Sequence, residues 1–164
     1  NSVKIAGDKL DKDIVEYIKE KFNVIVGLRE AEDVKKQIGA ATAAMTEEKI
    51  SLKGRNLTTG LPETIVVTTY DVNAAIIDSL REILRVIKIT LEQTPPELAS
   101  DIMENGIVLS GGGALLKNID RYISEQTGIP VYIADNPTQC VIKGVGKALD
   151  SIQVLKKAVK TKKG

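Results

Sequence analysis

Three consecutive glycines, Gly111 to Gly113, are the strongest candidate for a binding element in this sequence. They follow an apolar run at residues 107–109, expected to be a buried strand, and precede a segment at 116–127 with helical apolar spacing. Glycines between a strand and a helix let a ligand reach bare backbone, and the helix start adds unpaired N–H groups and the positive end of a dipole. A tight turn that binds nothing explains the triplet alone equally well. No Gly-Lys-Ser/Thr follows, so it is not a P-loop, and its spacing is not that of a dinucleotide-binding fingerprint.

A second candidate is the charged segment that contains Glu32 and Lys35. These residues are three apart in an expected helix at residues 29–38, so their side chains share one face. Such a pair can hydrogen-bond ribose hydroxyls and the edge of a base. A solvated ion pair between the two is the simpler interpretation, and the residues alone favour it.

Two further charged groups also have simple explanations. Asp8, Asp11 and Asp13 lie close together in sequence, and we interpret them as caps at a helix start rather than as a metal site. The Lys-rich tail at residues 156–163 could touch an anionic membrane surface, but a frayed, solvated chain end is favoured.

Composition excludes several classes of protein. The 164 residues carry 23 basic and 22 acidic side chains, without the basic excess that nucleic-acid binders usually show. The chain has no histidine and one cysteine, Cys140. This excludes an internal disulfide, a structural zinc site and catalysis by Ser-His-Asp or Cys-His groups, and a reducing compartment is expected. No apolar run reaches the roughly 20 residues that span a bilayer.

Apolar periodicity predicts the elements that must position these residues. The first helix is marked by apolar residues at every fourth position, namely Leu10, Ile14, Ile18 and Phe22. A short strand is expected at residues 3–5, a hairpin at 49–53 and 63–69, and the longest helix at 72–92 with Asp71 as its cap.

The second half of the chain predicts an α/β layer. It alternates helix, strand, glycine turn, helix, strand and helix, an order typical of crossover connections. A last main helix is expected at residues 139–149, with a shorter one up to Val159. The hairpin region at about residues 47–69 does not fit this order and is interpreted as an inserted subdomain.

Several segments, in this order, resemble the MreB family of bacterial actins, the rod-shape-determining proteins. Residues 5–11 resemble the family's Gly-Asp strand-to-helix element, and residues 32–35 its Glu-x-x-Lys adenosine-contact helix. The other similar segments are residues 57–62, 94–98, 107–116, 127–131 and 143–149. The resemblance covers nearly the whole chain.

The resemblance implies an α/β fold, one lobe of an actin-like (ribonuclease H-like) ATPase. Its larger subdomain would be residues 1–26 and 70–164, and residues 27–69 would form a small inserted α/β subdomain. The ligand would be ATP or ADP, with Mg²⁺ in the full-length protein. The implied nucleotide-binding residues are Glu32, Asp33, Val34, Lys35, Gly111, Gly112, Gly113, Ala114 and Leu115. No catalytic residue and no metal ligand is expected among them.

The resemblance also implies a function. Family members polymerise into cytoplasmic, membrane-associated filaments that organise cell-wall growth and set cell shape. The implied partners are other copies of the protein, the cell-shape and cell-wall synthesis machinery, and the inner membrane through another lobe; no nucleic acid is expected. The alternatives are a lobe of another ATPase of the actin superfamily, such as a chaperone or sugar kinase, and a pure interaction module.

The family's two phosphate loops are expected before Asn1. The chain starts without Met, in what we interpret as the middle of a strand. We therefore expect a piece of a longer protein that binds nucleotide weakly and does not hydrolyse it alone, because phosphoryl transfer depends on groups that position the phosphates and the metal.

Overall fold

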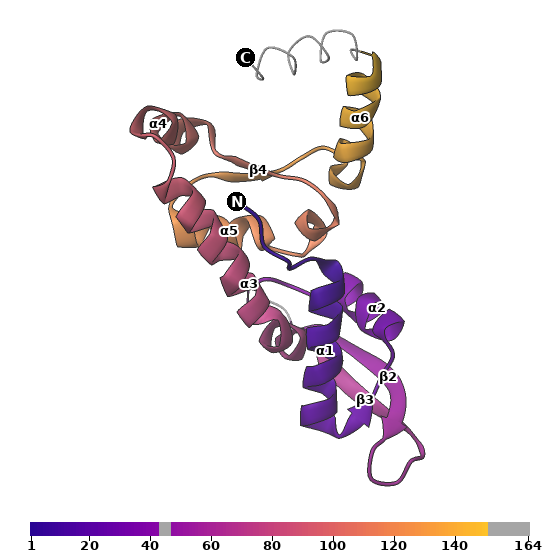
Figure 1. Cartoon of the computed structure of the whole chain (residues 1–164). Coiled ribbons are helices and arrows are strands. Elements are labelled where there is room, and N and C mark those ends of the chain that lie inside the picture. Colours follow the sequence, from indigo (N-terminus) through magenta and orange to yellow (C-terminus); the bar gives the residue numbers. More distant parts are fainter. Residues whose placement is uncertain (43–46, 151–164) are drawn as a thin grey trace.

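The computed structural model describes residues 1–42 and 47–150 (Figure 1). The expected short helix up to Val159 and the Lys-rich tail lie outside the described residues. Helices occupy α1 (Gly7–Phe22), α2 (Leu28–Ile38), α3 (Thr69–Glu92), α4 (Pro96–Asn105), α5 (Ile119–Thr127) and α6 (Cys140–Asp150). Strands occupy β1 (Val24–Ile25), β2 (Lys49–Asn56), β3 (Pro62–Thr68), β4 (Ile107–Leu109) and β5 (Val131–Ile133). Single 3₁₀ turns occupy η1 (Gly112–Leu115) and η2 (Pro137–Gln139).

The core lies where α1, α2 and α3 meet the three-stranded sheet. The predicted apolar face of α1 is confirmed, because Leu10, Ile14 and Ile18 are all buried. Asn23 ends α1 in the left-handed conformation, with φ of 56°, which asparagine tolerates better than most residues. Ile76 of α3 packs into the same core. Burial of these aliphatic side chains is the main source of stability.

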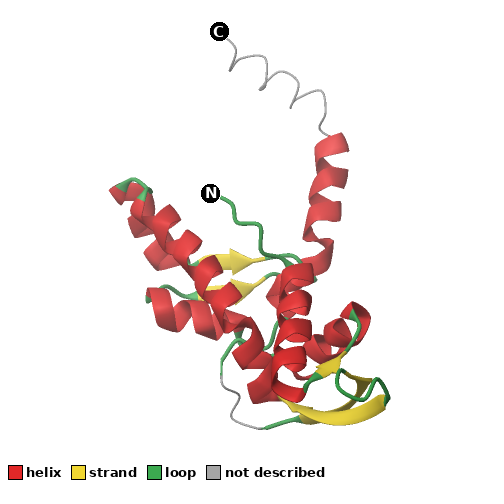
Figure 2. Cartoon of the chain, turned by 60° about the horizontal axis from the view of Figure 1, so that its bottom comes forward, coloured by secondary structure: helices red, strands yellow, loops and turns green. Residues whose placement is uncertain are grey.

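The predicted hairpin is confirmed and belongs to an antiparallel sheet with the order β1-β2-β3. Gly54 of β2 lies beside the antiparallel partner strand β1, and a Cβ atom there would come within 2.6 Å of the carbonyl oxygen of Ile25. Only glycine allows this close approach of the two strands. Figure 2 shows this sheet at one end of the described chain, separate from the parallel pair β4-β5.

The helix α3 connects the region of the three-stranded sheet to the region of the parallel pair β4-β5 (Figure 1). It starts in a capping box, in which Thr68 and Asp71 each accept a hydrogen bond from the other's backbone N–H group. The prediction that Asp71 is the N-cap was therefore wrong by one turn, because Thr68 holds that position. Among the described residues, no helix is long and apolar enough to cross a membrane.

Three other predictions were wrong. Residues 3–5 form no strand, because none of the described residues pairs with them. The residue before α1 is Ala6, and no side chain caps this helix, so the capping interpretation of the acidic residues near it fails. The strand β4 is not buried, since Val108 is 65% exposed and no described layer covers that face.

Candidate functional site

The helix α2 has one buried side, which packs on the core, and one exposed side. Ala31, Val34 and Ile38 are buried against the core, so Val34 is a packing residue and is not accessible to a ligand. Asp33 lies on the opposite, exposed side. Of the four residues predicted on this helix, Glu32, Asp33 and Lys35 remain candidates for direct ligand contact, and the first and last of these lie on the side nearer the core.

Lys35 is held at the junction of α1 and α2. Its Nζ atom lies 2.6 Å from Oδ1 of Asp11, and it donates a hydrogen bond to the carbonyl oxygen of Gly7 at 3.1 Å. Oδ1 of Asp11 accepts no well-directed hydrogen bond from the described residues. The contact between Lys35 and Asp11 is therefore mainly an attraction of opposite charges. The pair connects the first turns of α1 to the last turns of α2.

Glu32 does not pair with Lys35, so the ion pair that the residues alone favoured is wrong. Its carboxylate instead pairs with Lys36 at 2.7 Å, one helical turn further on. The hydrogen bond from Lys36 lowers the pKa of Glu32, and the nearby charge of Lys36 adds to this effect. Glu32 remains partly exposed and ionised at the surface of α2.

The glycine turn is open backbone. Gly111 has φ of 88°, a conformation that favours glycine, and its N–H donates to the carbonyl oxygen of Pro137 at 2.9 Å. A Cβ atom at Gly112 or Gly113 would meet no atom within 4 Å. Their N–H groups donate to no acceptor among residues 1–42 and 47–150.

The prediction that the glycine turn leads directly into an α-helix was wrong. It continues into the 3₁₀ turn η1, and α5 starts only at Ile119, after Asn118 has adopted φ of 60°. Ala114 in η1 is buried, while Leu115 is 62% exposed. Any ligand at this turn would therefore meet free glycine N–H groups and the exposed Leu115 side chain, and not the start of a long helix.

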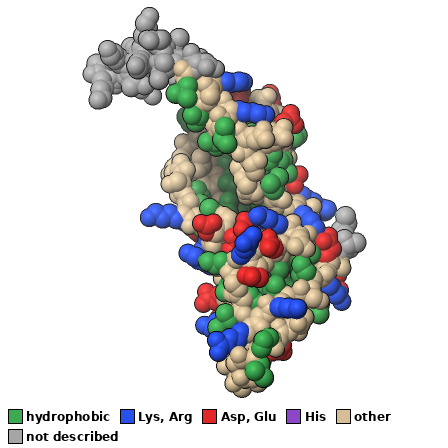
Figure 3. All heavy atoms as spheres, turned by 90° about the vertical axis from the view of Figure 1, so that its right-hand side faces the viewer, with side chains coloured by type: hydrophobic (Ala, Val, Ile, Leu, Met, Phe, Trp, Pro, Cys, Tyr) green, Lys and Arg blue, Asp and Glu red, His purple; other side chains and the backbone are tan. Residues whose placement is uncertain are grey.

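The two predicted segments are joined through Lys117. Its backbone forms a parallel bridge with Ala40, and its carbonyl oxygen accepts a hydrogen bond from the N–H of Ala41 at 2.8 Å. Its ammonium donates to the carbonyl oxygen of Gln37 at 2.8 Å and to Glu48 at 2.9 Å. The end of α2 is thus fastened to the segment that follows the glycine turn. Figure 3 shows that the molecule is hollowed between the part that carries α6 and the part that carries α1 and α2.

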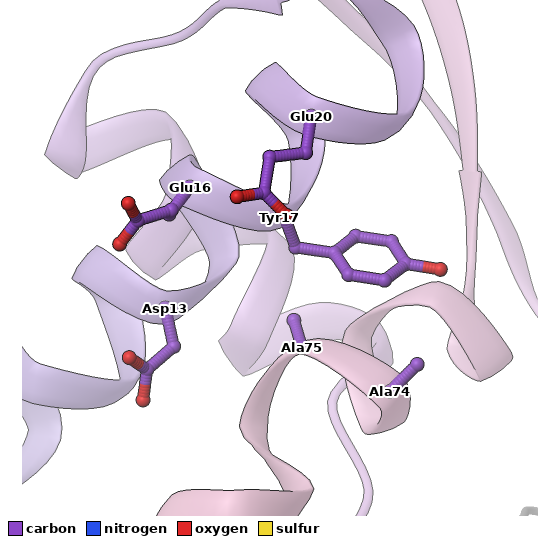
Figure 4. A pocket seen from close by; sticks show the side chains of 6 residues that line it. All are labelled: Asp13, Glu16, Tyr17, Glu20, Ala74 and Ala75. Atoms are coloured by element: carbon purple, nitrogen blue, oxygen red, sulfur yellow. The ribbon is translucent and has the colours of Figure 1, made fainter.

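A separate groove of about 180 Å³ lies between α1 and α3 (Figure 4). The residues that line it are Asp13, Glu16, Tyr17, Glu20, Ala74 and Ala75. Asp13 in this groove accepts a hydrogen bond from Ser79 at 2.5 Å and pairs with Lys9. None of the predicted nucleotide-binding residues lines the groove, and within the described residues no three His, Cys, Asp or Glu side chains could hold a metal ion.

Sequence reasoning missed two features of this region. Asp11 lies three residues before Ile14 and seven before Ile18, on the buried face of α1, and this position was a signal that the carboxylate needs a partner inside the fold. The acidic groove could have been inferred from Glu16 and Glu20, which are four apart and therefore neighbours on one helix face.

A family model described as MreB/Mbl protein matches residues 1–157. The chain belongs to the MreB/Mbl family. It is 41% identical over 157 residues to the cell shape-determining protein Mbl of Bacillus subtilis strain 168, covering 96% of this chain and 47% of that protein. It is 42% identical over 154 residues to the cell shape-determining protein MreB of Escherichia coli K12, covering 94% of this chain and 44% of that protein. The chain thus spans about half the length of these MreB/Mbl relatives.

Solved structures show the actin-like fold that was predicted. MreB5 of Spiroplasma citri bound to ADP superposes with a TM-score of 0.90 at 36% identity, over 96% of this chain and 48% of that one. The same protein bound to AMPPNP gives the same TM-score over 96% of this chain and 47% of that one. A MamK mutant bound to AMPPNP superposes with a TM-score of 0.69 at 24% identity, over 84% of this chain and 42% of that one. This likeness shows the fold alone. The division of this MreB/Mbl chain at residues 26–27 and 69–70 stays a prediction.

Proposed function

We propose that this chain is the nucleoside-binding lobe of a bacterial actin that assembles into filaments, with ATP and ADP as its ligands. The observation that carries the proposal is the fastening of α2 to the glycine turn through Lys117. The helix that carries Glu32 and Lys35 and the segment with free backbone N–H groups are thereby held on one structural unit.

The residues present fit a nucleotide. Phosphate oxygens accept hydrogen bonds from free backbone N–H groups, and the bare backbone at Gly112 and Gly113 leaves room for them. The carboxylate of Glu32 can accept from a ribose hydroxyl, and the ammonium of Lys35 can donate to one. Similarity to MreB5, which was solved with ADP and with AMPPNP, supports the same ligand class.

Hydrolysis is expected to need groups outside this chain. We propose that Mg²⁺ and the phosphate loops belong to the remainder of a longer protein, since this chain covers 47% and 44% of its relatives Mbl and MreB. Phosphoryl transfer depends on placing the phosphates and the metal, so the chain alone should bind nucleotide weakly and leave it intact.

The biological role follows from the family. We propose that the complete protein polymerises on the cytoplasmic side of the inner membrane and organises cell-wall synthesis, with another lobe making the membrane contact. The cell shape-determining relatives Mbl and MreB support this role. A lobe of a chaperone or sugar kinase is disfavoured by the family match, which covers residues 1–157.

Titration with a fluorescent adenine nucleotide tests the proposal. We expect saturable binding that Gly112→Val weakens without a change in thermal stability, because a side chain there meets no atom of the described chain. A pure interaction module would show no binding. Sedimentation of the full-length protein after addition of ATP tests assembly: filaments pellet, whereas a chaperone or kinase stays in the supernatant.

A further inference from the structure

Asp11 is a carboxylate buried at the start of α1. The residue is 6% exposed and lies on the same helix face as Ile14 and Ile18. Burial of a charged group in such surroundings is unfavourable unless an opposite charge compensates it. The compensating charge is Lys35, whose Nζ lies 2.6 Å from the Asp11 carboxylate.

The ammonium of Lys35 has three N–H donors, and the fold uses only part of this capacity. One donor serves the carbonyl oxygen of Gly7, and the charge of the group faces Asp11. The Lys35 side chain is 14% exposed, so it is not fully enclosed by the fold. A remaining N–H is therefore available to a ligand from a fixed position.

The pairing also decides what kind of ligand atom suits Lys35. Because Asp11 neutralises the ammonium, its attraction for a charged phosphate is reduced. A neutral oxygen that needs one directed donor, such as a sugar hydroxyl, fits the arrangement better. Glu32, three residues earlier on α2, offers a carboxylate acceptor on the same helix, and this carboxylate pairs with Lys36.

We propose that Asp11 is a positioning residue of the nucleoside site, which fixes Lys35 so that the site selects a ribose over a deoxyribose. This inference rests on the proposed function, because it assumes that α2 binds the sugar. Asp11 acts through Lys35 and makes no contact with the ligand itself.

The competing role for Asp11 is purely structural, as an ion pair that packs α2 against α1. The two roles differ in one observable. Loss of a structural pair lowers stability and weakens all nucleotides equally. Loss of a positioning pair also removes the preference for ribose, because the ammonium is no longer held in place.

The experiment measures the dissociation constants of ADP, 2′-deoxy-ADP and 3′-deoxy-ADP for the whole chain, with thermal unfolding as a parallel readout. The variants are Asp11→Asn, Lys35→Gln and the two combined. Asp11→Glu keeps the charge on a longer stem, and Asp8→Asn is the matched control, an exposed carboxylate in the first turn of the same helix.

In the unmodified chain we expect ADP to bind about tenfold more tightly than at least one deoxy analogue, the size expected for one hydrogen bond from a charged donor. Asp11→Asn and Lys35→Gln should each bring this ratio close to one, and the double variant should do no more. Asp11→Glu should retain part of the preference, and Asp8→Asn all of it.

Two outcomes overturn the inference and can be told apart. If Asp11→Asn unfolds at a lower temperature but keeps the ribose preference of the unmodified chain, Asp11 is only structural. If the unmodified chain binds no nucleotide, the proposed function fails and this inference fails with it. Should Asp11→Asn not fold, Asp11→Glu decides, because full retention of the preference after displacement of the carboxylate contradicts positioning.

Discussion

Ala40 and Lys117 form a parallel backbone bridge, although the first follows α2 and the second follows the glycine turn. Asn73 of α3 secures the same point, since its side-chain amide donates to the carbonyl oxygens of Ala40 and Ala41, both at 3.0 Å. The end of α2 is thus held from two sides, by the glycine-turn segment and by the longest helix.

Replacement of Asn73 by alanine should destabilise the fold. It leaves two part-buried carbonyl groups without this donor, and we expect the free energy of unfolding to fall by about 1–3 kcal/mol. Urea unfolding measures this change. Asn105→Ala is the matched control, because Asn105 also donates to a backbone carbonyl, but an exposed one in its own helix, and should change stability by less than about 0.5 kcal/mol. Equal effects of the two changes would argue against the fastening role of Asn73.

Neighbouring glycines in the turn should respond differently to alanine. Gly111 has φ of 88° and ψ of 174°, a region that almost only glycine adopts, so Gly111→Ala should lower the free energy of unfolding by about 1–3 kcal/mol. Gly112 has open space around it, so Gly112→Ala should leave stability unchanged and weaken nucleotide binding. Thermal melts and the nucleotide titration separate the two effects. Unchanged nucleotide affinity in Gly112→Ala would remove this glycine from the site.

Acid should weaken the fold through Asp71. Burial raises the pKa of this carboxyl, but the hydrogen bonds from Lys21 and Thr68 outweigh burial and leave the pKa below its ordinary value. The folded state therefore takes up a proton less readily than the unfolded state, so the stabilisation is complete above the ordinary Asp pKa of about 3.9 and is lost as the pH falls through the folded pKa.

Urea unfolding between pH 6 and pH 3 measures this dependence. Asp71→Asn should reduce the loss of stability on acidification, whereas Asp8→Asn, an exposed carboxylate of α1, should leave it as it is. An acid dependence that is the same in all three proteins would show that Asp71 does not contribute to it.

Replacing a core isoleucine should lower the free energy of unfolding far more than replacing a surface isoleucine. Ile76 is fully buried between α3 and its neighbours, and Ile142 of α6 is 74% exposed. Ile76→Ala should cost about 2–5 kcal/mol through lost burial and a cavity, and Ile142→Ala less than about 0.5 kcal/mol. Denaturant unfolding compares them. A large effect at Ile142 would mean that α6 is packed in solution against something that covers it.

Local patterns predicted most of the elements because their causes are local. The spacing of Leu10, Ile14 and Ile18 defines the buried face of α1 without reference to any other segment. The start of α3 was misplaced because Thr68 and Asp71 are both good capping residues, and only the folded geometry shows which one precedes the helix.

The candidate site was less predictable because its contacts are distant in sequence. The partner of Asp11 is Lys35 from another helix, and Lys117 contacts the end of α2 from beyond the glycine turn. The burial of β4 was misjudged because it depends on which layers cover Val108, and a run of apolar residues does not reveal that.

The most direct test follows the backbone amide signals of the chain by nuclear magnetic resonance while ADP is added. If α2 and the glycine turn form one nucleotide grip, the amides of Glu32, Lys35, Gly112 and Gly113 should shift together with a single dissociation constant. The largest shifts are expected at Gly112 and Gly113, whose N–H groups have no acceptor within the described chain. Shifts confined to the α1–α3 groove, different constants for the two segments, or no shifts at all would contradict the account.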